Sequence, residues 1–264
     1  MNHIIVPVDL SNNSKDALRY AGHLAERAGA NIMIIHSQSL LQKAIAFTTG
    51  KGETEKDPQK WILKRIRKLK EKHPEIIVDF KITKDDIINS LEKSIESANA
   101  DLVVMGTQGQ NENPDTFLGS TSGALAKTTE IPVLLIPPGF KFKGIDRIVF
   151  AAKNTFVKYI GALDPIIHIN QIFKPHVQLL HLGEQPDPIP ESSFSILKVI
   201  NDITRYGNDN FNESIREYLT QHHADLLCVI RRKRGFVEKM MEPSKTLASK
   251  FYTDIPVLVL IGED

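Results

Sequence analysis

The stretch that decides the fold is Ala100–Pro137, ADLVVMGTQGQNENPDTFLGSTSGALAKTTEIPVLLIP. It begins with a short apolar run at 101–105, the pattern of a strand that is buried on both faces of a parallel sheet. A loop containing glycines follows, and a helix is predicted from Gly119 until Pro132 ends it. A second apolar run at 133–136 predicts another buried strand. The order is therefore strand, loop, helix, strand.

The glycines of this stretch have a regular spacing. Gly106, Gly109 and Gly119 follow the pattern G-x2-G-x9-G, and Ser120 and Thr121 come next. Glycines allow a backbone to approach an anion without a Cβ clash, and the N–H groups of a first helical turn point toward such an anion. The alternative interpretation is that the first two glycines only form a tight turn and the third only allows close helix packing. Their position between two buried strands favours a phosphate site.

Length and composition exclude several classes of protein. A chain of 264 residues is natural for two domains. The 33 basic and 32 acidic side chains give no overall positive field, which argues against a nucleic-acid-binding protein. No apolar run approaches the ~20 residues of a membrane span. The only cysteine, Cys228, lies in an apolar run, so a disulfide framework is excluded. With no recognisable signal peptide, a cytoplasmic location is expected.

The first half alternates strand and helix patterns. Strands are predicted at 4–8, 32–35 and 76–82, and helices from Ser11 or Ser14, from about Gln59 and from Asp85-Asp86. This alternation predicts a doubly wound parallel α/β sheet, with the alternating strand 76–82 at an edge. Asp9, Ser37 and the loop after Gly106 all follow strand ends. We therefore expect them to converge on one crevice.

The second half repeats the first. Ala224–Val229 matches Ala100–Met105, and Ile255–Leu258 matches Ile131–Leu134, both at an offset of 124 (225 − 101 and 255 − 131). The pattern predicts a tandem duplication, with one domain at 1–138, a second at 145–264 and about five strands in each.

The two predicted domains differ in their site residues. At the same offset the three glycines become Ile230, Lys233 and Pro243, and in the parallel first strands Asp9 corresponds to Lys153. The second domain therefore lacks the glycine signature and is predicted to be degenerate.

The chain resembles the universal stress protein family. The resemblance rests on Pro7-Val8-Asp9, on Ile34-Ile35-His36, on the glycine signature and on the Ile-Pro-Val-Leu sequence that leads into the closing strand. It implies a Rossmann-like fold of the adenine nucleotide alpha hydrolase type. It also implies an ATP site in the first domain. In that site Asp9 would lie by the nucleoside and Ser37 by the base, and the phosphate residues would be Gly106, Gly109, Gly119, Ser120 and Thr121.

The loop at 107–115 departs from the family pattern because it contains two acids and no cation. A triphosphate there requires a metal such as Mg²⁺ or a distant base. The leading hypothesis is a cytoplasmic stress or regulatory protein that binds an adenine nucleotide, ATP first. One alternative is a slow ATPase or phosphotransferase with Ser120 as a Mg²⁺ ligand. The other is an interaction scaffold that binds no nucleotide.

Several conspicuous residues have simpler interpretations. His36 and His181 stand at equivalent strand ends, which favours a shared structural hydrogen bond over catalysis. Arg231–Arg234 is interpreted as a solvated loop, with an anion or partner patch as the alternative. Asp85-Asp86 is a favourable helix start. The recurring Asp101 and Asp225 are interpreted as residues of helix-to-strand turns.

The two closing strands, 133–136 and 257–260, are apolar enough to be hazardous as open sheet edges. Fusion in one chain raises their effective concentration, so pairing within the chain is predicted to outcompete pairing between chains. We expect an intramolecular pseudo-dimer. This arrangement does not exclude further oligomerisation.

Overall fold

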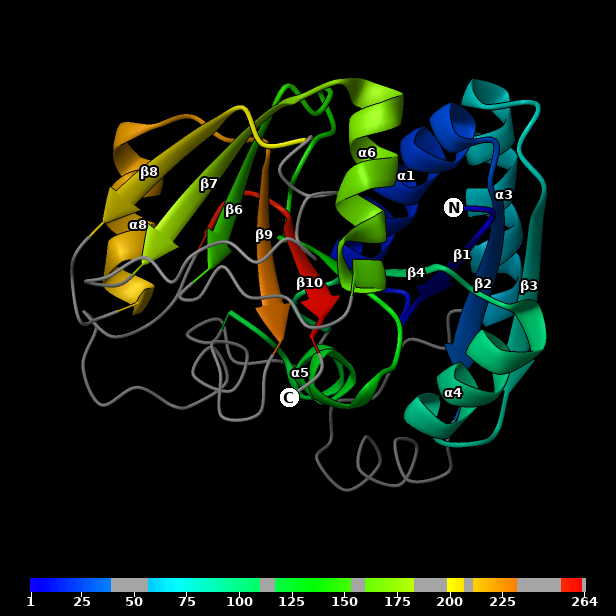
Figure 1. Ribbon diagram of the computed structural model, residues 1–264. Coiled ribbons are helices and arrows are strands. Elements are labelled where there is room, and N and C mark those ends of the chain that lie inside the picture. Colours follow the sequence, from blue (N-terminus) through cyan, green and yellow to red (C-terminus); the bar gives the residue numbers. More distant parts are fainter. Residues whose placement is uncertain are drawn as a thin grey trace.

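The computed structural model describes residues 1–38, 57–109, 117–152, 160–182, 199–206, 211–231 and 253–262 (Figure 1). Within them the strands are β1 (His3–Pro7), β2 (Asn31–Ser37), β3 (Val78–Thr83), β4 (Leu102–Gly106), β5 (Val133–Ile136), β6 (Arg147–Ala152), β7 (His176–Leu182), β8 (Asp202–Tyr206), β9 (Leu226–Arg231) and β10 (Val257–Ile261). The helices are α1 (Asn12–Ala28), α3 (Pro58–Lys72), α4 (Ile87–Ala98), α5 (Ser120–Thr128), α6 (Asp164–Phe173) and α8 (Phe211–Gln221), with a 3₁₀ turn η1 (Ile160–Leu163) before α6.

The strands form one sheet in the order β3-β2-β1-β4-β5-β10-β9-β6-β7-β8. The first five strands have the order 3-2-1-4-5, and the last five repeat it as 8-7-6-9-10. Every pairing is parallel except that of β5 with β10. This is the predicted doubly wound α/β fold, with β3 at an edge as its alternating sequence indicates.

Helices cover both faces of the sheet and make three layers. Ile4 and Val6 of β1 face a core that includes side chains of α1, α3 and α6, whereas Ile5 faces a core with side chains of α4, α5 and α8. Both cores contain residues from the two halves of the chain. Burial on both faces explains why the central strands are apolar without alternation. None of the described helices combines the length and apolar character needed to cross a membrane.

Local sequence signals set the ends of the helices. Ser11 is the N-cap of α1, and its hydroxyl accepts the N–H of Ser14 at 3.0 Å. Gly29 ends α1 in the left-handed conformation, with φ of +67°, which glycine adopts without strain. Asp86 caps α4 by accepting the N–H of Ile88 at 2.9 Å. These contacts confirm the predicted helix starts and the predicted stop at Gly29.

The recurring aspartates hold the first strand of each half. The Asp101 carboxylate accepts the N–H of His3 at 2.9 Å, and the Asp225 carboxylate accepts the N–H of Arg147 at 2.9 Å. Burial raises the pKa of Asp101, but the bonds from the N–H groups of Asn2 and His3, together with the charges of the N-terminus and His3, outweigh burial and leave the pKa below its usual value. Asp101 and Asp225 are therefore more than turn residues, because each ties the start of one strand to its neighbour.

The two halves meet where β5 and β10 pair. The strands run antiparallel, with Leu134 opposite Leu258 at the centre of the register. All four residues of β5 are buried. The pairing of the two closing strands within one chain agrees with the prediction, and it leaves β3 and β8 as the edges of the sheet.

The β5–β10 pairing predicts how an isolated first half behaves. A fragment of residues 1–140 leaves the apolar strand β5 as an open edge, so we expect it to self-associate or to be insoluble. Size-exclusion chromatography with light scattering measures this, and the full chain at the same concentration is the control. A well-folded monomeric fragment at high concentration would contradict the expectation.

Candidate functional site

The predicted site residues Asp9, Ser37 and Gly106 lie at the carboxyl ends of neighbouring strands of the sheet. β1 pairs with β2 on one side and with β4 on the other, so the strand order reverses between β1 and β4. Asp9 follows the end of β1, Ser37 ends β2 and Gly106 ends β4. Ligands of open α/β sheets bind outside the carboxyl ends of the strands at such a reversal.

Asn13, in the first turn of α1, organises this edge although it was not among the predicted site residues. Its side chain is buried, its Nδ2 donates to the carbonyl of Ile136 at 2.9 Å, and its Oδ1 accepts the N–H of Gln108 at 3.0 Å. The amide therefore ties the start of α1 to the end of β5 and to the loop after β4. The sequence around Asn13 could not predict these partners, because they lie 95 and 123 residues away in the chain.

Gly106 is a glycine because Asn13 lies against it. A Cβ at position 106 would lie 2.5 Å from Oδ1 and 3.2 Å from the backbone carbonyl carbon of Asn13. Real Cβ contacts do not reach the shorter distance, so a side chain here would push the start of α1 away. Crowding at this glycine comes from the protein itself. Close packing is therefore one reason for glycine at position 106, a role that the alternative interpretation of the sequence gave only to Gly119.

Gly119 is the N-cap of α5 and offers no side chain to the first turn of the helix. Its own N–H donates to the carbonyl of Thr107 at 2.7 Å, and Ser122 Oγ donates to the same carbonyl at 2.7 Å. The carbonyl of Thr107 thereby fixes the start of α5 against the end of β4. Ser120 is exposed and Thr121 is half-buried in the same turn. Gly109 is exposed, and residues 110–116, with the two loop acids, lie outside the described residues.

The other predicted contacts lie on β1 and β2. Asp9 is exposed, and its carboxylate accepts the N–H of Ser11 at 3.0 Å. Ser37 is buried, and its hydroxyl donates to the carbonyl of Asp85 at 2.7 Å, which holds the turn before α4. A carboxylate and a hydroxyl both keep acceptor capacity after one such bond.

The two strand-end histidines do not share one role. His36 is buried and its Nδ1 donates to the carbonyl of Val8 at 2.8 Å, which confirms the structural interpretation for this residue. His181 is also buried, but neither of its ring nitrogens has a partner within the described part of the chain. The prediction of a shared hydrogen bond is therefore wrong for His181 as far as the described residues extend.

Arg231 is not part of a solvated loop. It ends β9 in the second half, and its Nη1 donates to the carbonyl of Thr129 at 2.7 Å, where α5 ends. A second, longer contact of 3.4 Å reaches the carbonyl of Ala126. A cation at a helix C-terminus satisfies unpaired carbonyls and complements the helix dipole. The prediction is corrected for Arg231, whereas 232–234 lie outside the described residues.

Comparison with known proteins identifies a family over residues 1–137 of the chain. The family model described as "Universal stress protein family" matches residues 1–137. No curated protein sequence is similar enough to the chain to give a match.

Solved structures show the same fold over nearly the whole chain. A universal stress protein from Archaeoglobus fulgidus matches with 19% identity and a TM-score of 0.62, covering 100% of this chain and 97% of its own. A putative universal stress protein from Pseudomonas aeruginosa matches with 12% identity and a TM-score of 0.65, covering 99% of this chain and 94% of its own.

The contact between Gly106 and Asn13 can be tested by a double-mutant cycle. Gly106→Ala should lower the free energy of unfolding by about 1–3 kcal/mol because the new methyl group overpacks the site. In an Asn13→Ala background the same change should cost less, by roughly 0.5 kcal/mol or more, because the clash with Oδ1 is gone. Urea denaturation of the four proteins measures the coupling.

The control cycle combines Gly106→Ala with Arg19→Ala, a substitution on the exposed part of α1. These two changes should be additive to within about 0.5 kcal/mol. An additive Asn13 cycle would show that Gly106 is required for a reason other than this contact.

The role of Arg231 predicts a second stability effect. Arg231→Ala should lower the free energy of unfolding by roughly 1–2 kcal/mol, since it leaves the end of α5 without its charged donor. Arg231→Lys keeps the charge but not the guanidinium geometry, so it should lose less. Thermal and chemical unfolding measure both variants. Wild-type stability in Arg231→Ala would refute the capping role.

Proposed function

The chain belongs to the universal stress protein family, and we propose that its first half binds an adenine nucleotide, with ATP as the preferred ligand, at the carboxyl ends of β1, β2 and β4. The observation that carries this proposal is the start of α5. A helix begins there at a glycine N-cap without a side-chain cap, directly beside the loop that leaves β4.

The phosphates are assigned to this helix start. The N–H groups of a first helical turn point out of the helix, and the dipole adds partial positive charge. Ser120 and Thr121 belong to that turn. Gly109, the second glycine of the sequence signature, lies in the loop after β4. The N–H of Gly119 already donates to the carbonyl of Thr107, so Gly119 is not assigned as a phosphate donor in this proposal.

The nucleoside is assigned to the neighbouring strand ends. The exposed carboxylate of Asp9 suits ribose hydroxyls or the adenine amine, both of which donate hydrogen bonds. Ser37 is buried and bonded to Asp85, so it supports the base pocket chiefly by fixing the turn before α4.

A triphosphate at this site needs a counter-charge. The nearest cation of α5 in the sequence is Lys127, which lies two turns into the helix and is exposed. We therefore include Mg²⁺ in the proposal, because carboxylate and phosphate oxygens are its usual ligands and the loop carries Glu112 and Asp115. The biological role is proposed to be regulatory or stress-related in the cytoplasm, where the single free and buried Cys228 fits a reducing compartment.

The second half is proposed to be a duplicated domain that serves as a structural partner, with domains at 1–138 and 145–264. Equivalent contacts support the duplication. The hydroxyls of Thr129 and Thr253 each accept an N–H at 3.3 Å from the isoleucine two residues later. These contacts are retained, whereas Ile230 inside β9 stands in place of Gly106, the last residue of β4.

Nucleotide binding can be measured by isothermal titration of nucleotide-free protein with ATP, ADP and AMP, with and without Mg²⁺. We expect one saturable site per chain. Gly119→Val should abolish binding, since its branched side chain would occupy the space proposed for phosphate. Asp9→Asn should weaken binding about tenfold, which corresponds to one charge-assisted hydrogen bond of ~1.4 kcal/mol.

The matched control is Asp101→Asn, which changes the same side chain at the opposite end of the sheet and should leave the affinity unchanged. No heat with any of the three nucleotides at millimolar concentration would refute the proposal and favour the interaction scaffold.

A further inference from the structure

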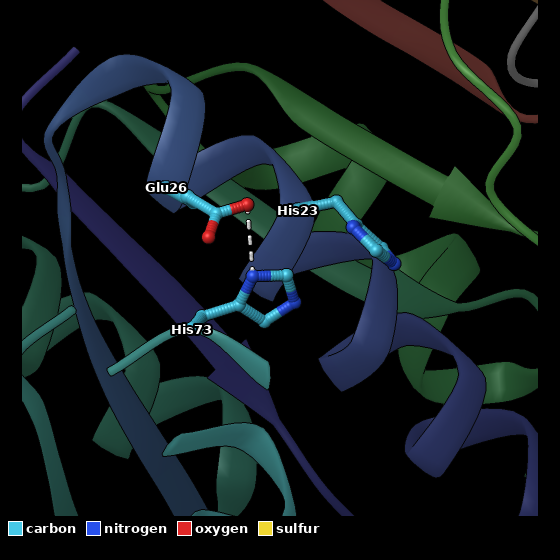
Figure 2. A group of neighbouring side chains, drawn as sticks. All are labelled: His23, Glu26 and His73. Atoms are coloured by element: carbon cyan, nitrogen blue, oxygen red, sulfur yellow. Dashed lines mark ion pairs between the residues drawn. The ribbon is translucent and has the colours of Figure 1, made fainter. Parts of the chain in front are cut away.

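A second group of ligand-type side chains lies away from the proposed nucleotide site. His23 and Glu26 stand one turn apart on α1, and His73 follows the end of α3 (Figure 2). The helix α1 starts next to the carboxyl end of β1, where the nucleotide site is proposed. At the usual rise per residue, His23 lies roughly 18 Å along the helix from Ser11. The cluster therefore lies toward the other end of the sheet.

The donor atoms of this cluster converge. One ligand atom from each of the three residues lies within 4.8 Å of the other two. Nδ1 of His73 is 2.9 Å from a carboxylate oxygen of Glu26, and the rings of His73 and His23 meet edge to face with their centroids 4.7 Å apart. His73 thus contacts both residues of α1, as Figure 2 shows.

The contact between His73 and Glu26 is short but is not a well-directed hydrogen bond. His73 is 4% exposed, and its Nδ1 has no partner of hydrogen-bond geometry. Two acceptor atoms 2.9 Å apart repel each other unless a proton or a cation lies between them. A buried imidazole nitrogen without a proper partner, directed at a carboxylate, is the arrangement that a bound cation would satisfy.

We propose that His23, Glu26 and His73 form a binding site for a divalent transition metal ion, with Zn²⁺ as the best fit. Two imidazoles and one carboxylate are a usual set of protein ligands for zinc, and a water molecule completes four-coordination. Such a site would join the second half of α1 to the end of α3.

The required movement is small. Ligands bound to zinc at about 2.0–2.1 Å in a tetrahedron lie roughly 3.4 Å apart. Donor atoms now up to 4.8 Å apart must close by about 1.4 Å at most, whereas Nδ1 of His73 and the Glu26 oxygen, now 2.9 Å apart, must open by about 0.5 Å. Glu26 can make this movement because its side chain is 42% exposed. Its exposure also leaves the fourth position open to water.

The two histidines are held in place from behind. The ring of His23 stacks on Phe142 with a centroid distance of 4.8 Å. The backbone N–H of His73 donates to the carbonyl of Leu69 at 2.8 Å. A Cβ on Gly22 would lie 3.2 Å from Cδ2 of His73 and 2.5 Å from a methyl group of Leu69, so the glycine allows α3 to approach α1. Fixed ligands lose little conformational entropy when a metal binds.

Nearby positive charges oppose a cation. Arg27 and Lys72 both contribute repulsion at His23. Binding requires that the metal–ligand bonds outweigh this repulsion. Because salt screens the repulsion, the affinity for the metal ion should rise with ionic strength. A surface site that relies on carboxylates alone would show the opposite trend.

The test uses the full chain, stripped of metal, and Zn²⁺ as the probe in isothermal titration. We expect one saturable site per chain and a rise in thermal stability with added Zn²⁺. His23→Ala and Glu26→Gln should each weaken the affinity at least tenfold. Glu26 is exposed and His23 is half-buried, so neither change removes a fully buried side chain. Co²⁺ in place of Zn²⁺ should give the intense visible absorption of tetrahedral coordination.

The matched control is His176→Ala. His176 makes a surface contact of 2.9 Å with Asp202, so it offers a histidine–carboxylate pair without a third ligand. Its loss should leave Zn²⁺ binding unchanged. The proposal is overturned if no saturable binding occurs at millimolar Zn²⁺, or if His23→Ala and Glu26→Gln bind as the wild type does. Unchanged binding in these two variants would mean that Glu26 and His73 form only an ion pair.

Discussion

The antiparallel pairing of β5 with β10 is the contact on which the rest of the structure depends. Each of these strands is buried and is already paired on its other side with β4 or β9. Left open, they would expose unpaired backbone groups beside apolar side chains. Their pairing turns two five-stranded sheets into one and makes both hydrophobic cores continuous between the halves.

The same pairing brings the second half to the far end of the helix that begins at the candidate site. Because β9 lies next to β10, Arg231 reaches the carbonyl of Thr129 at the end of α5. The start of α5 faces the proposed phosphates and its end is held by the other half. The two halves differ at the ends of these strands: β4 stops at Gly106, whereas β9 passes through Ile230 and continues to Arg231.

Contacts within the protein hold the proposed site at the carboxyl ends of the strands in place. Asn13 accepts the N–H of Gln108, just after β4, and the carbonyl of Thr107 holds the start of α5. Groups that are already held in this way lose less entropy when they bind a ligand. Gly106 contributes to this arrangement by allowing α1 to lie against the strand end.

Sequence alone determined the features that depend on near neighbours in the chain. The apolar runs predicted the central strands, Ser11 and Asp86 predicted helix starts, and Gly29 predicted a helix end. The sequence repeat at a fixed offset predicted that strands of the second half correspond to strands of the first. These signals are readable because burial on both faces, helix capping and left-handed backbone each restrict residue type locally.

Only the tertiary structure decided the contacts between distant segments. The partners of Asn13 lie 95 and 123 residues away, and Arg231 caps a helix 102 residues earlier in the chain. His73 meets Glu26 only because α3 packs on α1 at Gly22. No local pattern encodes such partners, since an asparagine, an arginine or a histidine looks the same in sequence whether it faces water or another element. The fold brings these side chains to their partners, and their chemistry follows from that placement.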